Sequence, residues 1–132
     1  MKYIVDTHIL IWTLLDPKKL SLTILSDYEG ASEVQVSNIN FWEISLKYKL
    51  GKLDLGGLTP EDIFIAAKES NFTVINIDAE ITSSLYKLPL RDHKDPFDRL
   101  LVWYAIQNKI PLISRDGKFS QYEQDGLELA GG

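Results

Sequence analysis

The chain has 132 residues, a formal net charge of −5 and no cysteine. Its length suits a single domain over residues 1–132, and the lack of cysteine excludes disulfide frameworks, thiol nucleophiles and cysteine-ligated metal centres. Hydrophobic residues make up 45% and charged residues 25%, as in ordinary soluble globular proteins. No apolar run is long enough for a membrane span and no signal peptide is evident, so we expect a cytoplasmic protein.

The first half of the chain alternates between strand and helix patterns. The predicted elements are, in chain order, a strand over Lys2–Val5, helices over Thr7–Leu15 and Ser21–Tyr28, a strand over Glu33–Ser37 and a helix over Asn38–Leu50. Pro17 stops the first of these helices, and Gly51 stands where a C-terminal glycine would close the last.

The second half continues the alternation after a loop over Gly51–Gly57. The predicted elements are a helix from Thr59 to about Ser70, a strand over Phe72–Ile77, a helix that Asp78 caps and that runs to about Lys87, an apolar helix from Phe97 onward, and strands over Ile110–Ser114 and Leu127–Ala130. Such alternation predicts an α/β fold with a mainly parallel sheet.

Four acidic residues fall at equivalent places in these units. Asp6 ends the first strand, and Glu43 lies in the early turns of the helix after the second strand. Asp98 lies in the first turn of the apolar helix, and Asp116 comes just after the strand that follows it. Because parallel strands end at one edge of a sheet, where the helices between them begin, we expect all four acids at that edge.

Carboxylates held close together repel one another unless some take up protons or a cation lies among them. A set of oxygen ligands without cysteine suits a hard ion, Mg²⁺ or Mn²⁺. Such an ion can polarise a phosphate oxygen and neutralise charge in an in-line displacement. The chemistry indicated is metal-assisted phosphodiester hydrolysis.

Each acid also has a structural interpretation. Asp95 before Pro96 is suited to cap a helix, and we interpret it as mainly structural. Glu43 lies three residues after Asn40, which is the spacing of a capping box. Asp6 can be interpreted as a helix cap, and Asp98 as an acid favoured in the first turn of a helix. Asp116, before Gly117, can be interpreted as a turn residue.

Other candidate residues are less specific. The two histidines either contact substrate or are satisfied locally; they are His8 and His93. The three tryptophans are expected in the core; they are Trp12, Trp42 and Trp103. Candidate phosphate contacts are the lysines Lys18, Lys19, Lys47, Lys49 and Lys52. The aspartate Asp92 is expected to be solvated.

Four ordered motifs together resemble one known family. They are "YIVDTHILIW", "NFWEISLKYKLGKL", "HKDPFDRLLVWYA" and "LISRDGKF", and they span Lys2 to about Phe119. The chain is similar to the PIN-domain ribonucleases, and within them to the VapC-like toxins of bacterial toxin–antitoxin modules.

This resemblance implies a three-layer α/β/α sandwich and endonucleolytic cleavage of RNA with Mg²⁺ or Mn²⁺. It carries the family's catalytic and metal-binding quartet over to Asp6, Glu43, Asp98 and Asp116, with Thr7 and Ser114 as accompanying polar residues and Asp95 as a further auxiliary acid. It also implies a homodimer, and an antitoxin that inserts a segment near the active site.

Two other functions compete with this one. The first is a catalytically silent PIN scaffold that binds RNA or protein, although a retired site would be expected to lose some of its acids. The second is a small phosphatase in which Asp6 is the nucleophile, although such enzymes have Asp-x-Asp where this chain has Asp6-Thr7-His8.

Overall fold

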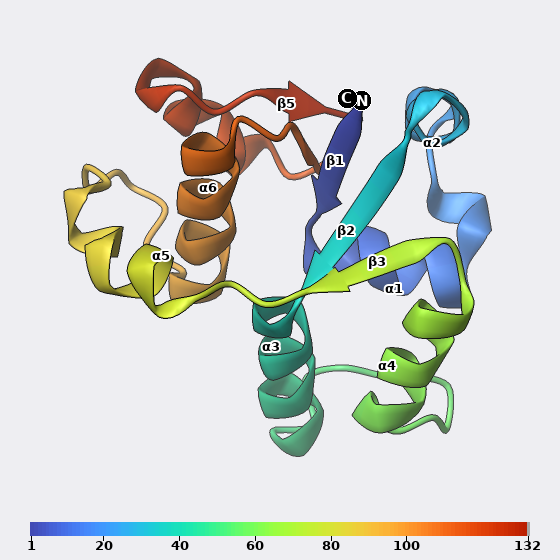
Figure 1. Cartoon of the computed structure of the whole chain (residues 1–132). Coiled ribbons are helices and arrows are strands. Elements are labelled where there is room, and N and C mark those ends of the chain that lie inside the picture. Colours follow the sequence, from blue (N-terminus) through green and yellow to red (C-terminus); the bar gives the residue numbers. More distant parts are fainter. Residues whose placement is uncertain (132) are drawn as a thin grey trace.

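The computed structural model describes residues 1–131 and centres on a five-stranded, wholly parallel sheet (Figure 1). The strand order is β3-β2-β1-β4-β5. The strands are β1 (Lys2–Val5), β2 (Glu33–Ser37), β3 (Phe72–Ile75), β4 (Leu112–Ile113) and β5 (Leu129–Ala130). The predicted parallel sheet is therefore confirmed, and it places the first strand of the chain at the centre.

The helices follow the predicted order. They are α1 (Thr7–Leu15), α2 (Leu22–Gly30), α3 (Asn38–Lys49), α4 (Pro60–Glu69), α5 (Ala79–Ser84) and α6 (Pro96–Asn108), with 3₁₀ segments η1 (Pro17–Lys19), η2 (Leu85–Lys87) and η3 (Gly117–Asp125). Residues 1–131 contain no helix with the length and apolar character that crossing a bilayer would require.

Three strands are shorter than expected, and two of them for visible reasons. The amide of Ile77 donates to the Asn38 side chain at 2.8 Å instead of continuing β3. The amide of Ile110 donates to the carbonyl of Ala105 at 3.0 Å, which closes the end of α6 and delays β4 until Leu112. The last strand likewise begins only at Leu129.

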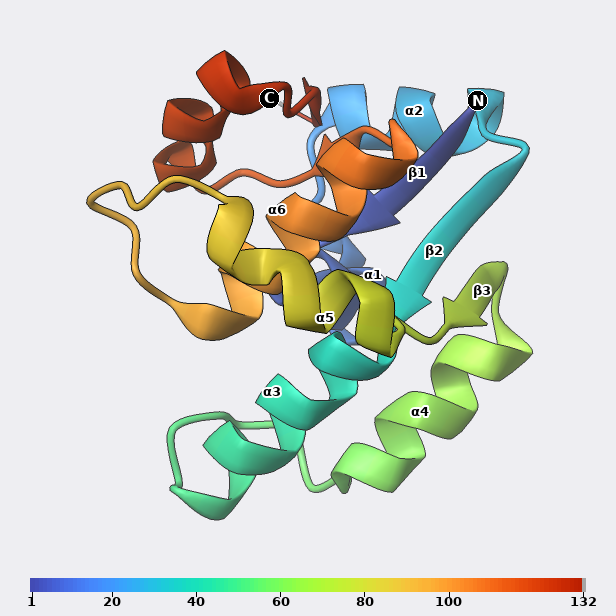
Figure 2. The ribbon, with the colours of Figure 1, turned by 60° about the vertical axis from the view of Figure 1, so that its left-hand side comes forward.

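Helices cover both faces of the sheet (Figures 1 and 2), and each face carries a separate hydrophobic core. Side chains alternate along a strand, so Val5 packs with residues of α1, α2 and α4, whereas its neighbour Ile4 packs with residues of α6 and η3. Ile113 and Leu112 divide in the same way in β4. This arrangement confirms the three-layer α/β/α sandwich.

Several hydrogen bonds hold the N-terminal turn of α6 in place. Asp95 caps the helix, and the guanidinium of Arg99, which is buried, donates to the carbonyls of Leu88 and Pro89 at 3.0 and 3.1 Å and to the hydroxyl of Tyr122 at 3.3 Å. These bonds join α6 to η3 and to the loop that precedes the helix. The position of Asp98 in the first turn is thus fixed by buried contacts of its neighbour.

Only part of the expectation for tryptophan is met. Trp103 is buried and donates its indole N–H to Ser84 at 2.9 Å, while Trp12 is half-buried. Trp42 is 56% exposed, so its placement in the core is wrong. Helix α3 buries the face that contains Asn40, Glu43 and Ile44, and Trp42 lies beside that face with its ring against Phe97 at a centroid distance of 4.8 Å.

Candidate active site

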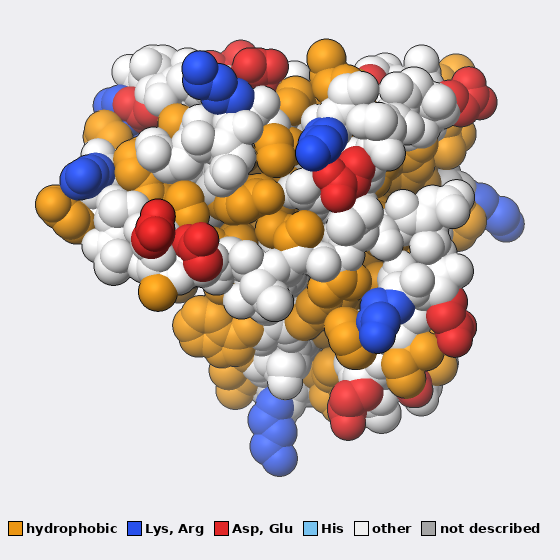
Figure 3. Space-filling view, viewed as in Figure 1, with side chains coloured by type: hydrophobic (Ala, Val, Ile, Leu, Met, Phe, Trp, Pro, Cys, Tyr) orange, Lys and Arg blue, Asp and Glu red, His pale blue; other side chains and the backbone are white. Residues whose placement is uncertain are grey.

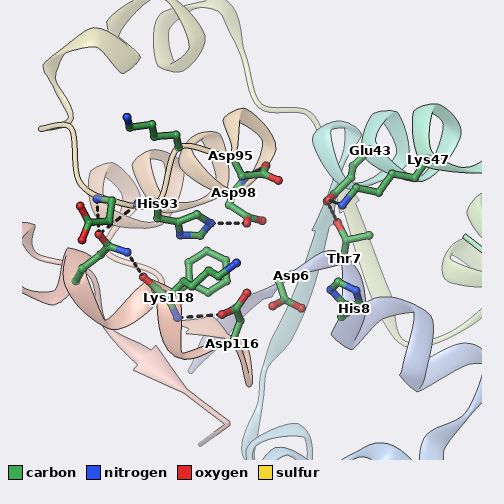
Figure 4. A pocket seen from close by; sticks show the side chains of 14 residues that line it. Asp6, Thr7, His8, Glu43, Lys47, His93, Asp95, Asp98, Asp116 and Lys118 are labelled. Atoms are coloured by element: carbon green, nitrogen blue, oxygen red, sulfur yellow. Dashed lines mark hydrogen bonds and ion pairs between the residues drawn. The ribbon is translucent and has the colours of Figure 1, made fainter. Parts of the chain in front are cut away.

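The four predicted acids and Asp95 line one pocket of about 410 Å³ (Figure 4). Asp6 and Asp116 come from the ends of β1 and β4, Glu43 from α3, and Asp95 and Asp98 from the start of α6. Residues that are distant in the sequence therefore meet at the carboxyl edge of the sheet.

Asp6 has both of its carboxylate oxygens engaged. Oδ1 accepts from the amide of Ile9 at 2.9 Å and so caps α1, while Oδ2 accepts from the hydroxyl of Ser114. The side chain is buried, and burial raises the pKa of Asp6 against the lowering effect of these two hydrogen bonds. Asp6 is thus both a helix cap and a wall of the pocket.

Glu43 is not a capping residue, and the capping-box interpretation of its position was wrong. The box is formed one turn earlier by Ser37 and Asn40, whose side chain accepts from the Ser37 amide at 2.8 Å. Glu43 is buried and accepts from the hydroxyl of Thr7 and from the ammonium of Lys47, each at 2.5 Å. Its carboxylate is therefore held toward the pocket by one neutral and one charged donor.

The carboxylates of Asp95 and Asp98 lie close to that of Glu43 in the pocket. Oδ1 of Asp95 accepts from the amides of Phe97 and Asp98 at 2.9 and 3.1 Å, as predicted for a cap. Oδ2 of Asp98 is 2.7 Å from Nε2 of His93. One carboxylate oxygen from each of Glu43, Asp95 and Asp98 falls in a group whose atoms all lie within 4.8 Å of one another.

Asp116 lies at the exposed side of the pocket. Its Oδ1 accepts from the amide of Lys118 at 2.9 Å, and its own amide donates to the hydroxyl of Ser114 at 3.0 Å. Ser114 donates in turn to Asp6, so one hydroxyl links the two acids from the ends of neighbouring strands.

The PIN domain family matches residues 3–124 of this chain. The chain belongs to the PIN domain family. This result confirms the family resemblance carried by the four motifs.

Similar proteins cover nearly the whole length. The chain is 22% identical over 119 residues to "Ribonuclease VapC22" of Mycobacterium tuberculosis, with 90% of each protein covered. It also superposes on VapBC2 of Rickettsia felis, solved bound to a promoter DNA fragment, with a TM-score of 0.67, 18% identity, and 98% and 97% of the two chains covered. A third similar protein is M. tuberculosis VapC20, described as a sarcin-ricin loop cleaving toxin. It superposes with a TM-score of 0.60 and 16% identity, and the superposition covers 90% of this chain and 93% of VapC20.

Cationic side chains surround the acids of this PIN domain. They are Lys47, Lys94 and Lys118. Burial lowers the pKa of Lys47, but its contact with Glu43 and the nearby Asp95 and Asp98 outweigh burial and raise it overall. Lys94 and Lys118 were not among the predicted phosphate contacts, although Lys118 follows Asp116 by only two residues; the other four candidate lysines do not line the pocket.

The group of Glu43, Asp95 and Asp98 suits a small divalent cation. Its donor atoms are carboxylate oxygens only, which is the set preferred by Mg²⁺ and Mn²⁺. Burial, followed by the charge of Asp95, raises the pKa of Asp98 to about 7. Among carboxylates so close together, the charge is compensated either by a proton on one of them or by a bound cation.

The raised pKa makes the metal-free protein sensitive to pH. Between an unfolded pKa of about 3.9 and the folded value of about 7, the folded protein holds a proton on Asp98 that the unfolded chain has lost. The free energy of unfolding should therefore fall as pH rises through this interval. Above pH 7, Asp98→Asn should be the more stable protein by about 1 kcal/mol, or roughly 2–6 °C in melting temperature, and the difference should vanish near pH 4.

Melting curves in EDTA across this pH range test the expectation, with Asp54→Asn, at an exposed position outside the pocket, as the matched charge change. Mg²⁺ or Mn²⁺ should then stabilise the parent more than Asp98→Asn. A metal-free Asp98→Asn protein that is less stable at pH 8, with an undiminished shift on adding metal, would remove Asp98 from the site.

Proposed function

We propose that this chain is a metal-dependent endoribonuclease that acts as the toxin of a toxin–antitoxin pair. The observation that carries the proposal is the single pocket that gathers the carboxylates of Asp6, Glu43, Asp98 and Asp116 in a PIN domain. Two similar proteins, one named a ribonuclease and one described as a sarcin-ricin loop cleaving toxin, support the same activity.

The protein's own groups would hold the metal. Glu43, Asp95 and Asp98 offer its nearest oxygens, and Asp6 and Asp116 complete the negative field on the opposite side of the pocket. A bound Mg²⁺ or Mn²⁺ would polarise a phosphate oxygen and neutralise the charge that develops there. Because Thr7, Ser114 and backbone amides already hold these carboxylates, little reorganisation is required when RNA binds.

The lysines that line the pocket would help it to bind the negatively charged RNA backbone. A pocket of carboxylates repels the phosphate backbone, and cations at its rim offset this repulsion. Lys47 and Lys118 line the pocket on opposite sides (Figure 4), where they would contact the phosphates that flank the cleaved bond.

The phosphatase alternative fits the site poorly. Phosphatases of that kind have a second aspartate two residues after the nucleophile, and His8 occupies this position in the present chain. The silent scaffold differs from the enzyme only in activity, so cleavage assays separate the two.

Glu43→Gln tests the enzyme directly. Purified protein should cleave mixed RNA with Mg²⁺ or Mn²⁺ and lose this activity in EDTA. The amide should still accept from Thr7 and keep the fold, but it removes a negative charge from the metal site, so cleavage should fall by about 100-fold or more.

The matched control is Glu69→Gln, the same change at an exposed position at the end of α4, which should cleave like the parent. A folded Glu43→Gln protein with normal cleavage would sink the assignment of Glu43, and RNA binding without cleavage by the parent would favour the scaffold.

An exposed apolar stripe on α3 supports the proposed assembly with a second copy and with an antitoxin. The stripe consists of Trp42, Leu46 and Leu50, which are 56, 42 and 57% exposed and follow each other at helical spacing. Figure 3 shows hydrophobic side chains at the surface over this helix and over α4. In the following loop only Leu58 remains available, because Leu53 is half-buried and Leu55 is 2% exposed in the core.

We expect the purified chain to have twice its monomer mass of 15.0 kDa in solution. Burial of the stripe in the interface would be the cause, so Leu46→Lys should shift the mass toward the monomer. Light scattering measures the outcome, and Leu90→Lys, at an exposed position in the loop before α6, is the control. A parent that stays monomeric at high concentration and binds no cognate antitoxin would contradict the assembly.

A further inference from the structure

His93 is a buried polar side chain with one nitrogen that the fold leaves unused. Its residue exposure is 6%, and within residues 1–131 Nδ1 has no hydrogen-bond partner. Nε2, in contrast, lies 2.7 Å from Oδ2 of Asp98. One ring nitrogen is therefore paired and the other is not. A histidine buried only to fill space does not need the paired contact with Asp98, so this contact calls for an explanation.

The contacts decide which ring nitrogen carries the proton. With Asp98 ionised, a proton on Nε2 gives a charge-assisted donor to the carboxylate and leaves Nδ1 as an unpaired acceptor. A proton on Nδ1 alone would bury an N–H without an acceptor and would set Nε2 and the carboxylate of Asp98 against each other as two acceptors. The hydrogen-bond network therefore assigns the Nε2–H tautomer.

The backbone and ring of His93 are held by η3. The hydroxyl of Tyr122 donates to the carbonyl of His93 at 2.6 Å, and Gln121 accepts from the His93 amide at 3.4 Å. The ring of Phe119 lies edge-on to the imidazole at a centroid distance of 5.2 Å. These contacts fix the direction of the Nε2–H bond before any ligand arrives.

The bond to His93 also distinguishes the two oxygens of Asp98. Oδ2 is taken by the imidazole, while Oδ1 has no hydrogen-bond partner among the described residues. In Figure 4 the carboxylate of Asp98 lies between His93 and the space that faces Glu43.

We propose that His93 is a positioning residue, which holds Asp98 through Nε2–H so that one carboxylate oxygen remains directed at the divalent cation. The proposal rests on the proposed metal site and adds to it a residue that touches neither the metal nor the RNA. The role is that of a hydrogen-bond partner behind a metal ligand, whose loss weakens metal binding even though the ligand remains.

Two substitutions separate this role from simple packing. In His93→Gln the side-chain amide nitrogen can reach the place of Nε2 and donate to Asp98. In His93→Asn the amide is one bond shorter and falls near the place of Nδ1, so Asp98 loses its donor. Both side chains are polar and of similar size, and only the reach of the donor differs.

The measurement is the affinity of each metal-free protein for Mn²⁺ by calorimetric titration, with melting curves to show that each variant is folded. His93→Asn should bind Mn²⁺ about 10- to 100-fold more weakly than the parent, and His93→Gln should stay within about threefold of it. If His93→Asn does not fold, His93→Leu, which fills the space against Phe119 without a donor, takes its place.

A folded Asn or Leu variant that binds Mn²⁺ like the parent would overturn the role of His93, as would a Gln variant that loses as much affinity as Asn. In both cases the parent still binds, and the proposed metal site stands. A parent that binds no Mn²⁺ would instead overturn the metal site, and the role of His93 with it.

Discussion

The crowding of carboxylates at one edge of a parallel sheet is the constraint on which the rest of this structure depends. Parallel strands deliver their carboxyl ends to the same edge, so acids from β1, α3, α6 and the end of β4 meet in one pocket. Their mutual repulsion has to be compensated; burial first, and then the neighbouring charge of Asp95, raise the pKa of Asp98 to about 7. A fold that tolerates such repulsion must supply compensating contacts elsewhere.

Those contacts include one uncharged side-chain donor for each of three acids. Asp6 has the hydroxyl of Ser114, Glu43 has the hydroxyl of Thr7, and Asp98 has the imidazole of His93. Lys47 adds the charged contact, on Glu43. The carboxylates are thus oriented by the protein itself, and a cation entering the pocket would find its ligands already in place.

The apolar helix α6 connects this site to the core. Its buried residues fill one face of the sheet, and its first turn carries Asp98 to the pocket. Arg99, next in sequence, anchors the same turn to η3 through Tyr122, which also bonds the carbonyl of His93. The packing of α6 therefore also fixes the position of the Asp98 carboxylate, because Asp98 and the anchoring Arg99 lie in the same turn.

Local patterns in the sequence were enough to predict the sheet, the order of the helices and the meeting of the four acids. Caps at Asp6, Asp78 and Asp95 were also visible, because a cap depends on residues a few positions away. The capping box of α3 was placed at the wrong residues: the predicted bounds already put Ser37 just before the helix, but Asn40 was paired with Glu43 instead of with Ser37.

What the sequence could not provide were contacts between distant segments. The segment η3 has weak propensity of its own, and its place depends on packing of Phe119 and Tyr122 against α6. The pairing of His93 with Asp98 follows from that packing, so a histidine that looked ordinary in the sequence became part of the site. The exposure of Trp42 likewise depends on how much of α3 the neighbouring helices cover.

The location of a bound metal tests the central claim most directly. Crystals grown with Mn²⁺ and measured for its anomalous scattering would show where the ion lies. The account predicts an anomalous peak inside the pocket, in contact with a carboxylate oxygen of Asp98 and of Glu43 or Asp95. A saturating concentration of Mn²⁺ that gives no peak there, or a peak only at another surface, would contradict it.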